Sequence, residues 1–267
     1  MIKGEVFYLL RGLVGVIALL WLVLLSVYGR ALPDVVGVLA ARTSQLLTGA
    51  PHFNQIGGGF SANILISFAS MILAVIGGTV LGIGLISTSA AVKAVCGMVM
   101  NVLRNSPWLV VLYAVLFLLP FEFSILGYGI SFSPFSKAIV GLALPIAANF
   151  AEIFRGGVEA IPSGQWESAR ALGYRRLQIL RYVVIPQSIT LMLPNLMNLY
   201  AALFIGTSLV VITGASDVLS ISRTIIATDG ERIATAIYIY VLALFFVFAF
   251  PIAVGSRWLE LKLQARS

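Results

Sequence analysis

Long apolar runs alternate with short polar connections along this chain. Six of the runs meet or approach the ~20 mostly apolar residues that a helix needs to cross a bilayer. They lie at about 7–28, 62–86, 98–120, 135–151, 188–213 and 233–255. The pattern predicts an all-α, polytopic membrane protein with about six transmembrane helices.

The composition excludes an ordinary soluble domain. Hydrophobic residues make up 60% of the chain and the mean hydropathy is +1.04, which is more apolar surface than one globule can hide. The net charge of +7 lies in the connections, which is typical of membrane topology and not of nucleic-acid binding. A cleaved signal peptide is the alternative for the first run, but Tyr28 and Arg30 stand where small residues would prepare the cleavage site.

The lysines and arginines predict that both termini lie in the cytoplasm. With the N-terminus inside, twelve of the 17 fall in cytoplasmic segments. The other five are Arg30, Arg42, Lys137, Arg223 and Arg232. We therefore expect residues 1–61 to form a transmembrane helix and an extracytoplasmic linker, with a short amphipathic helix at 34–47. Residues 62–267 form the main transmembrane domain.

Small residues predict one close helix contact. Ala74, Gly78 and Gly82 recur every four residues in the second apolar run, so one face of that helix lets another approach closely. Cys96 has no second thiol and is expected to be a packing residue, with no metal site around it. His52 lies beside glycines and is expected to be a solvated loop residue.

Polar residues inside the later apolar runs are candidates for a solute path. Polar groups at membrane depth are costly, so they either serve function or bridge helices by hydrogen bonds, and both readings stay open. The candidates are Asn149, Asn195, Asn198, Thr207 and Ser208. Pro145 interrupts the fourth run and Pro194 the fifth, and the carbonyl groups that they free need other donors.

A charged island separates the fourth and fifth runs at 152–187. It holds Glu152, Arg155, Glu159, Glu167, Arg170, Arg175, Arg176 and Arg181. Its arginines place it in the cytoplasm. Ser163 as a cap and Gly173 as a terminator predict a short helix at about 164–172. An amphipathic stretch at 175–185 follows, closed by Pro186. The helix either lies on the membrane surface or docks into a partner protein through its small residues, with Trp166 and Leu172 as apolar anchors.

The run Glu167-Ser168-Ala169, followed by Gly173 and Ile185-Pro186, resembles the EAA loop of ABC importer permeases. Residues 152–173, Arg104-Asn105-Ser106-Pro107 and Trp258-Leu259-Glu260 are similar to the polar amino-acid branch of that family. The resemblance covers about residues 60–262. Asn105 and Asn149 depart from the residues usual there, and the first apolar run lies outside the five-helix core of that branch.

The resemblance implies a type I ABC importer permease for amino acids or related small polar solutes, located in a bacterial cytoplasmic (inner) membrane. The island helix would then be the coupling helix that contacts an ATPase. Its residues are Gln165, Trp166, Glu167, Ser168, Ala169, Arg170, Ala171, Leu172 and Gly173. The sequence has no G-x-x-x-x-G-K-S/T phosphate loop, so the chain is not expected to be an enzyme.

The same resemblance implies the partners. They are an ABC ATPase dimer that uses ATP and Mg, a second permease subunit, identical or homologous, and an extracytoplasmic solute-binding protein. The lipid bilayer surrounds the permease subunits. No cofactor is expected on this chain. Two other functions stay open: a secondary transporter driven by an ion gradient, which would use acids near the middle of its spans, and a membrane scaffold that recruits a soluble partner through the island.

Overall fold

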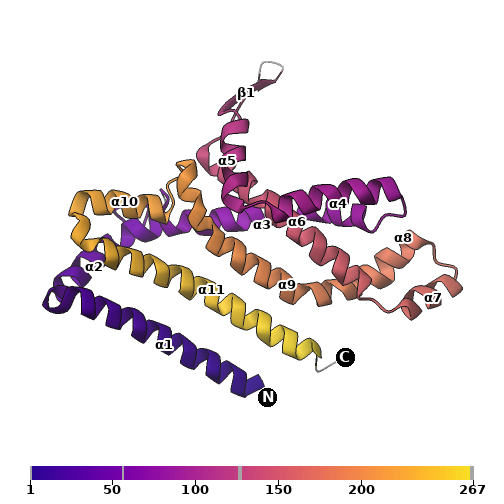
Figure 1. Cartoon of the computed structure of the whole chain (residues 1–267), viewed down its shortest axis with the longest axis horizontal. Coiled ribbons are helices and arrows are strands. Elements are labelled where there is room, and N and C mark those ends of the chain that lie inside the picture. Colours follow the sequence, from indigo (N-terminus) through magenta and orange to yellow (C-terminus); the bar gives the residue numbers. More distant parts are fainter. Residues whose placement is uncertain (1, 56, 126–127, 265–267) are drawn as a thin grey trace.

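The computed structural model describes residues 2–55, 57–125 and 128–264 as an elongated helical bundle (Figure 1). Its helices are α1 (Ile2–Tyr28), α2 (Leu32–Thr48), α3 (Gly59–Leu85), α4 (Ala90–Asn105), α5 (Trp108–Leu118), α6 (Pro134–Glu159), α7 (Ser163–Ala171), α8 (Arg176–Ile179), α9 (Ile185–Gly206), α10 (Val218–Asp229) and α11 (Ala234–Gln264). Short turns η1 (Gly29–Ala31), η2 (Leu180–Val184), η3 (Thr207–Thr213) and η4 (Glu231–Ile233) join some of them. The predicted all-α class is confirmed.

Five helical segments of the described chain are long and apolar enough to cross a membrane: Arg11–Thr48, Gly59–Leu85, Pro134–Glu159, Arg176–Thr213 and Glu231–Leu263. Helices α4 and α5 form a bent pair, and the number of candidate spans rises to six if this pair is counted as one span. The helix expected at 34–47 is α2. One feature was not predicted: an antiparallel hairpin of β1 (Glu122–Ile125) and β2 (Tyr128–Ser131) follows α5.

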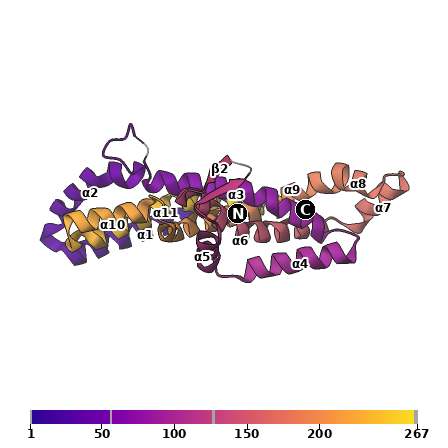
Figure 2. The same cartoon turned by 90° about the horizontal axis from the view of Figure 1, so that it is seen from above.

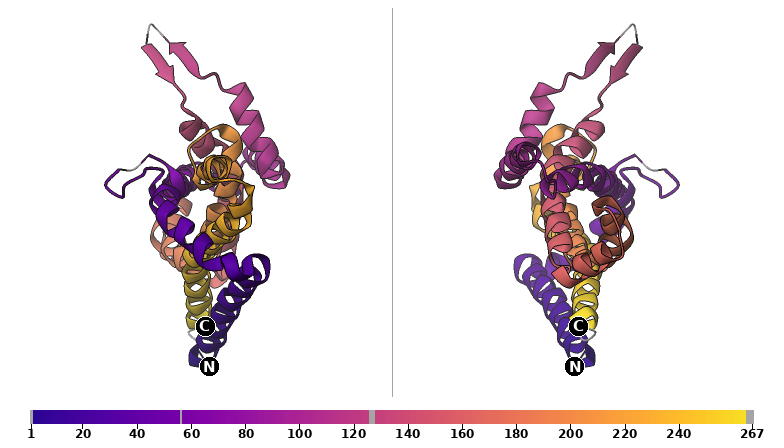
Figure 3. Two further views of the ribbon diagram at one scale, coloured as in Figure 1. Left: turned by 90° about the vertical axis from the view of Figure 1, so that its left-hand side faces the viewer. Right: turned by 90° about the vertical axis from the view of Figure 1, so that its right-hand side faces the viewer.

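The third predicted span, 98–120, is not one straight helix. Its two parts meet at 106°, and α5 with the hairpin stands out from the side of the bundle (Figures 1 and 3). Proline disfavours helical backbone in the residue before it, and Ser106 is extended there. The side chains of Asn105 and Ser106 also donate to carbonyl oxygens one turn back, at 2.8 and 2.6 Å, which closes α4. The run predicted at 98–120 is therefore a bent pair, broken at the polar residues 104–107, and hydropathy averaged over the run does not reveal this break.

Lys137, which the charge count placed on the side opposite the cytoplasm, lies inside α6 and is 1% exposed. Its ammonium donates to the carbonyl oxygens of Leu116 (3.0 Å) and Leu119 (2.6 Å), near the end of α5. The same nitrogen lies 3.4 Å from the centroid of the Phe121 ring. A buried charge is tolerated when polar groups surround it, and the carboxyl end of a helix favours a cation. Lys137 therefore fastens α5 to α6.

The predicted small-residue face is the contact between α3 and α6. A side chain added at Gly78 would place its Cβ 2.5 Å from the carbonyl oxygen of Ala147, and one at Gly82 would lie 2.6 Å from the Phe154 ring. Ala74 is fully buried in the same contact region. Cys96 packs its sulfur against Gly84, the packing role expected for it. These close approaches make α3 and α6 the central pair of the bundle.

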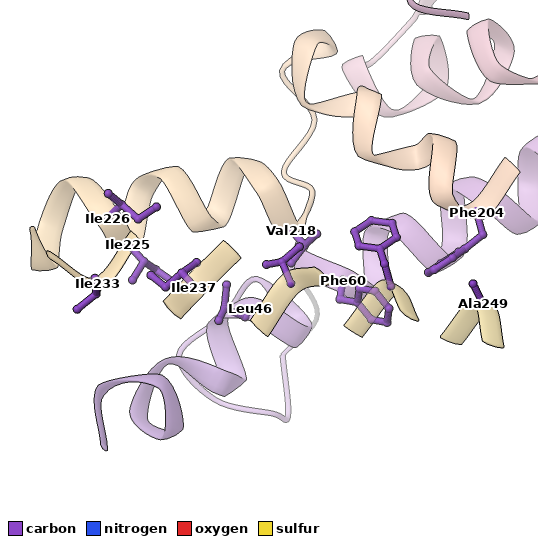
Figure 4. Close-up of a cluster of buried hydrophobic side chains, with 11 residues drawn as sticks. Leu46, Phe60, Phe204, Val218, Ile225, Ile226, Ile233, Ile237 and Ala249 are labelled. Carbon is purple, nitrogen blue, oxygen red and sulfur yellow. The ribbon is translucent and has the colours of Figure 1, made fainter. Parts of the chain in front are cut away.

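A buried apolar cluster joins α2, α3, α9, α10 and α11 (Figure 4). Phe60 and Phe204 meet edge to face there, with ring centroids 5.6 Å apart. Nearby, Arg42 of α2 forms a two-pronged ion pair with Asp229 of α10, at 2.8 and 2.6 Å. The cluster and the ion pair hold the amphipathic helix α2 against the bundle.

Two other boundaries differ from the prediction. The fourth run was expected to end near 151, but α6 continues to Glu159 because its acidic and basic side chains pair with one another. Pro186 was expected to end the amphipathic stretch, yet α8, η2 and α9 form one continuous run. The π-helical turn η2 shifts the hydrogen-bond register, so the missing N–H of Pro186 falls in the first turn of α9.

The long bundle has two distinct ends. α2 and α10 lie at one end, while α7 and α8 extend from the other (Figures 1 and 2). α1 and α11 pack side by side. The hydroxyl of Tyr28 accepts from the backbone N–H of Ala236 in α11 at 3.1 Å and donates to the carbonyl oxygen of Arg232 in η4 at 2.9 Å. The first turns of α1 and the last turns of α11 lie on the same side of the bundle as α7 (Figure 1).

Candidate functional site: the helix α7 and the polar residues of the spans

The short helix predicted at about 164–172 is α7, which spans Ser163–Ala171. Ser163 is its first residue and not its cap, because Pro162 holds the N-cap position with extended backbone. At the other end, Gly173 adopts φ +82° and donates to the carbonyl oxygen of Arg170 at 2.9 Å, and Tyr174 donates to Ala169 at 3.1 Å. This pair of bonds is a Schellman motif, which favours glycine. Gly173 thus ends α7 as predicted.

Most side chains of α7 face outward. The exposed members of the predicted coupling set are Gln165, Glu167, Ser168, Arg170, Ala171, Leu172 and Gly173. Ala169 is buried and Trp166 half-buried, and both pack on a cluster that includes Ile161, Ile179 and Val184. Trp166 therefore anchors α7 to its own bundle instead of offering apolar surface to a partner. Leu172 remains 79% exposed.

Hydrogen bonds tie the segment after α7 to the bundle. The backbone N–H of Arg175 donates to the side chain of Gln178 at 2.8 Å, which caps α8. Nη2 of Arg176 donates to the carbonyl oxygen of Ile86, the residue that ends α3, at 2.8 Å. Through α8 and η2 the chain then runs directly into α9. α8 therefore joins the segment after α7 both to the end of α3 and, through η2, to α9.

Charged side chains form a ladder on the last turns of α6. Glu152 accepts from Arg155 at 2.7 and 3.0 Å, and Arg155 donates to Glu159 at 2.7 Å. Arg104 of α4 lies 3.7 Å from Glu152. The ladder leads from the bend between α4 and α5 toward α7.

Of the five polar residues proposed for a solute path, three are buried or half-buried and two are exposed. Thr207 is fully buried, bonded to Asn63 and to its own helix, as expected for a bridge between helices. Asn149 is half-buried and donates to the carbonyl oxygen of Pro145 at 2.8 Å, and Ser208 is also half-buried. Asn195 and Asn198 are exposed on one face of α9. Exposed amides on a spanning helix are unfavourable toward lipid.

Sequence reasoning missed Asn63 and Asp217. Both are fully buried. Oδ1 of Asn63 accepts from the backbone N–H of Val218 at 3.0 Å, and the carboxylate of Asp217 caps α10 by accepting from Ser220 at 2.9 Å. An Asp before an apolar run is an N-cap signal that could have located Asp217. A single asparagine near the start of a span carries no such signal.

Residues 74–263 match the family described as "Binding-protein-dependent transport system inner membrane component". The chain belongs to this family. The match includes α7 and every predicted site residue, and it confirms the resemblance to ABC importer permeases noted in the sequence. Together with the apolar helices, it makes the protein a multi-pass inner-membrane component, which as a family is not enzymatic.

Relatives with named functions are similar over most of the chain. The "Glutamate/glutamine/aspartate/asparagine transport system permease protein BztC" of Rhodobacter capsulatus is 30% identical over 78% of this chain and 48% of its own length. The "Inner membrane amino-acid ABC transporter permease protein YhdY" of Escherichia coli is 31% identical over 78% and 56%. The chain thus spans about half the length of these relatives. The "Probable amino-acid ABC transporter permease protein YckA" of Bacillus subtilis is 29% identical over 79% and 89%.

Solved structures of ABC transporters have a similar fold. The structure entitled "Crystal structure of an amino acid ABC transporter with histidines" has a TM-score of 0.64 at 26% identity, over 78% of this chain and 92% of that one. An inward-facing MetNI methionine ABC transporter reaches a TM-score of 0.54 at 19% identity, over 74% and 91%. The second likeness shows the fold alone.

Proposed function

We propose that the chain is the transmembrane permease subunit of an ATP-driven ABC importer for amino acids or related small polar solutes. The observation that carries the proposal is α7: a short helix, projecting from one end of a membrane bundle of this family, ended by Gly173 and exposing Glu167 and Ser168. A separate ATPase holds this helix in a cleft. Two ATPases closing on ATP then move the permease between inward-open and outward-open states.

The assembly that we propose has a second permease subunit, identical or homologous, two ATPase subunits that use ATP and Mg, and an extracytoplasmic solute-binding protein. The end that carries α7 faces the cytoplasm, together with both termini. Eight basic residues belong to segments at this end: Lys93, Arg155, Arg170, Arg175, Arg176, Arg181, Arg257 and Lys262. Four lie at or near α2 and α10: Arg30, Arg42, Arg223 and Arg232. This excess supports the orientation.

We propose that Asn195 and Asn198 of α9 line the solute path. Both are exposed in the single chain, on the face that also carries Leu191 and Ile205. Amide groups at membrane depth favour water, solute or a protein partner over lipid. Placing this face toward the second permease satisfies the amides and gives a polar solute hydrogen-bonding groups along its route.

Reconstitution tests the proposal. The purified chain alone is expected to hydrolyse no ATP, while the complex with its ATPase hydrolyses ATP and is stimulated by a solute-loaded binding protein. Proteoliposomes that contain the complex should accumulate solute only with ATP. Uptake driven by an ion gradient, with the isolated chain and no ATPase, would show instead a secondary transporter. A chain that binds partners but moves no solute under any condition would be a scaffold.

A further inference from the structure

Beside α7 the surface holds a polar hollow of about 350 Å³. It lies between the turn that joins α3 to α4, the end of α6, and the segment from α7 to α8. Its polar lining consists of Ser87, Thr88, Lys93, Glu159, Trp166 and Arg176. A liquid water occupies about 30 Å³, so the hollow can admit a side chain with its hydration. It is thus large enough to be an interaction site and not only a packing defect.

The hollow carries an excess of positive charge. Lys93 and Arg176 are exposed cations in its wall. Its one acid, Glu159, is already neutralised by Arg155, whose Nη1 donates to it at 2.7 Å. Within the described ranges Lys93 has no ion-pair partner. A carboxylate is therefore the group that this lining favours.

The walls of the hollow are fastened to one another. Arg176 donates to the carbonyl oxygen of Ile86 at 2.8 Å, so the end of α3 is bonded to α8. Trp166 belongs to α7 and packs on the same cluster as Val158 and Ile161. A group seated in the hollow therefore touches α3, α4, α6 and α7 at once.

We infer that this hollow receives an acidic side chain of the ATPase subunit whose cleft holds α7. The inference rests on the proposed function, because α7 supplies one wall of the hollow and its occupant must come from whatever protein surrounds α7. The acid would pair with Lys93 and Arg176. The ATPase then has a second contact, on the α3–α4 turn, and moves α3 directly as well as through α7.

Reversal of one charge tests the contact. In the complete permease, Lys93→Glu is expected to raise the Kd for the ATPase by roughly tenfold or more, the size of a lost close charge pair. Lys93→Arg should bind as the unchanged chain does. Lys262→Glu is the matched control, because it makes the same charge change on α11 beside Trp258. A Kd for Lys93→Glu within about twofold of the control would overturn the inference.

Two further measurements test the contact even if the Lys93→Glu chain does not insert normally in the membrane. Lys93→Gln should make ATPase binding less dependent on salt, because one ion pair is lost; an unchanged salt dependence overturns the inference. In the Lys93→Glu chain, replacing the matching Asp or Glu of the ATPase by Lys should restore binding. If no acid near the ATPase cleft gives this rescue, the hollow has another occupant.

The control for the proposed function itself is Gly173→Val in α7. If Gly173→Val uncouples the complex while Lys93→Glu has no effect, the coupling function stands and only the second contact is wrong. If neither variant has an effect, α7 is not the coupling helix and both conclusions fail.

Discussion

The side-chain amide of Asn63 in α3 holds Thr207 at the point where α9 passes into η3. Nδ2 donates to the carbonyl oxygen of Thr207 at 3.2 Å and to its hydroxyl at 3.1 Å. The amide oxygen accepts from Val218 of α10 at 3.0 Å. One buried asparagine thus joins three separate segments of the chain near α2 and α10.

Asn63→Leu is expected to destabilise the protein by about 2–4 kcal/mol, because the N–H of Val218 and the polar groups of Thr207 lose buried partners. The melting temperature in detergent measures the loss. Ser222→Ala is the matched control, since Ser222 is also fully buried but its hydroxyl donates only within its own helix. Equal melting temperatures for the two variants would contradict the bridging role of Asn63.

Gly78→Ala is expected to destabilise the contact between α3 and α6 by about 1–3 kcal/mol, because the added methyl meets a backbone oxygen that cannot move away easily. Gly77→Ala is the control on the same helix. Its added methyl has Ala147 as nearest neighbour, at 3.7 Å, which is an ordinary contact. Helix propensity favours alanine over glycine at both positions, so Gly77→Ala should be neutral or stabilising. An equal change in melting temperature for the two variants would show that the close approach at Gly78 has no effect.

Asn198→Leu is expected to reduce solute uptake or change solute preference while the complex still assembles, because a bulky apolar group replaces an exposed amide on the proposed path. Uptake in proteoliposomes measures transport and solute preference, and size-exclusion chromatography measures whether the complex assembles. Ile189→Leu, a change at another exposed position of α9, serves as control. Thr207→Val, at the buried bridge, should lower stability and leave solute preference unchanged. Normal uptake by Asn198→Leu would assign that residue to packing.

Gly173→Val is expected to uncouple the ATPase with near-normal insertion in the membrane. A β-branched residue at φ +82° costs about 1–2 kcal/mol and changes the end of α7. Glu167→Lys should have a similar effect, because it reverses a charge on the exposed face of α7. Gly164→Ala, in the first turn and with open space around it, should be neutral. If Gly173→Val and Glu167→Lys both keep full transport that the binding protein stimulates, α7 is not the coupling helix. It is then a helix that lies on the membrane surface.

The ion pair between Arg42 and Asp229 predicts a dependence of stability on pH. The hydrogen bonds from Arg42 hold the pKa of Asp229 below its ordinary value. The carboxyl group of an aspartate in the unfolded chain has a pKa of about 3.9. The ion pair contributes its full stability at pH values above this pKa, and the contribution is lost as the pH falls through the lower pKa of Asp229 in the folded protein. Asp229→Asn should therefore lower the melting temperature at neutral pH and have little effect in strong acid. A difference that stays constant over this range would contradict the pairing.

The sequence predicted those features that depend on neighbours along the chain. Gly78 and Gly82 lie on one face because of helical spacing alone, and Gly173 ends α7 because no other residue adopts that backbone as readily. The bend before α5 was not predicted: Pro107 marks a break in the helix, but its position in the sequence does not give the angle between α4 and α5. Hydropathy measures how apolar a segment is, but it does not give the direction in which the helix runs.

The features that escaped prediction depend on contacts between distant segments. Lys137 counts as a topology charge until the end of α5 is known to lie beside it. Asn63 and Thr207 are 144 residues apart, and each alone is a polar residue in an apolar span. The path through Asn195 and Asn198 stays a prediction for the same reason, since we propose that the surface opposite α9 belongs to a second permease.

The fastening of Lys137 has a mechanical consequence. Each of the three protons of its ammonium group has a separate acceptor available, two carbonyl oxygens near the end of α5 and the face of one aromatic ring, so the link resists twisting as well as pulling. On its other side, α5 is joined to α4 only through the extended residues Ser106 and Pro107. If the helices of the bundle shift against one another, α5 and the strands after it should therefore turn with the amino-terminal half of α6 as one unit, with the pivot at Pro107.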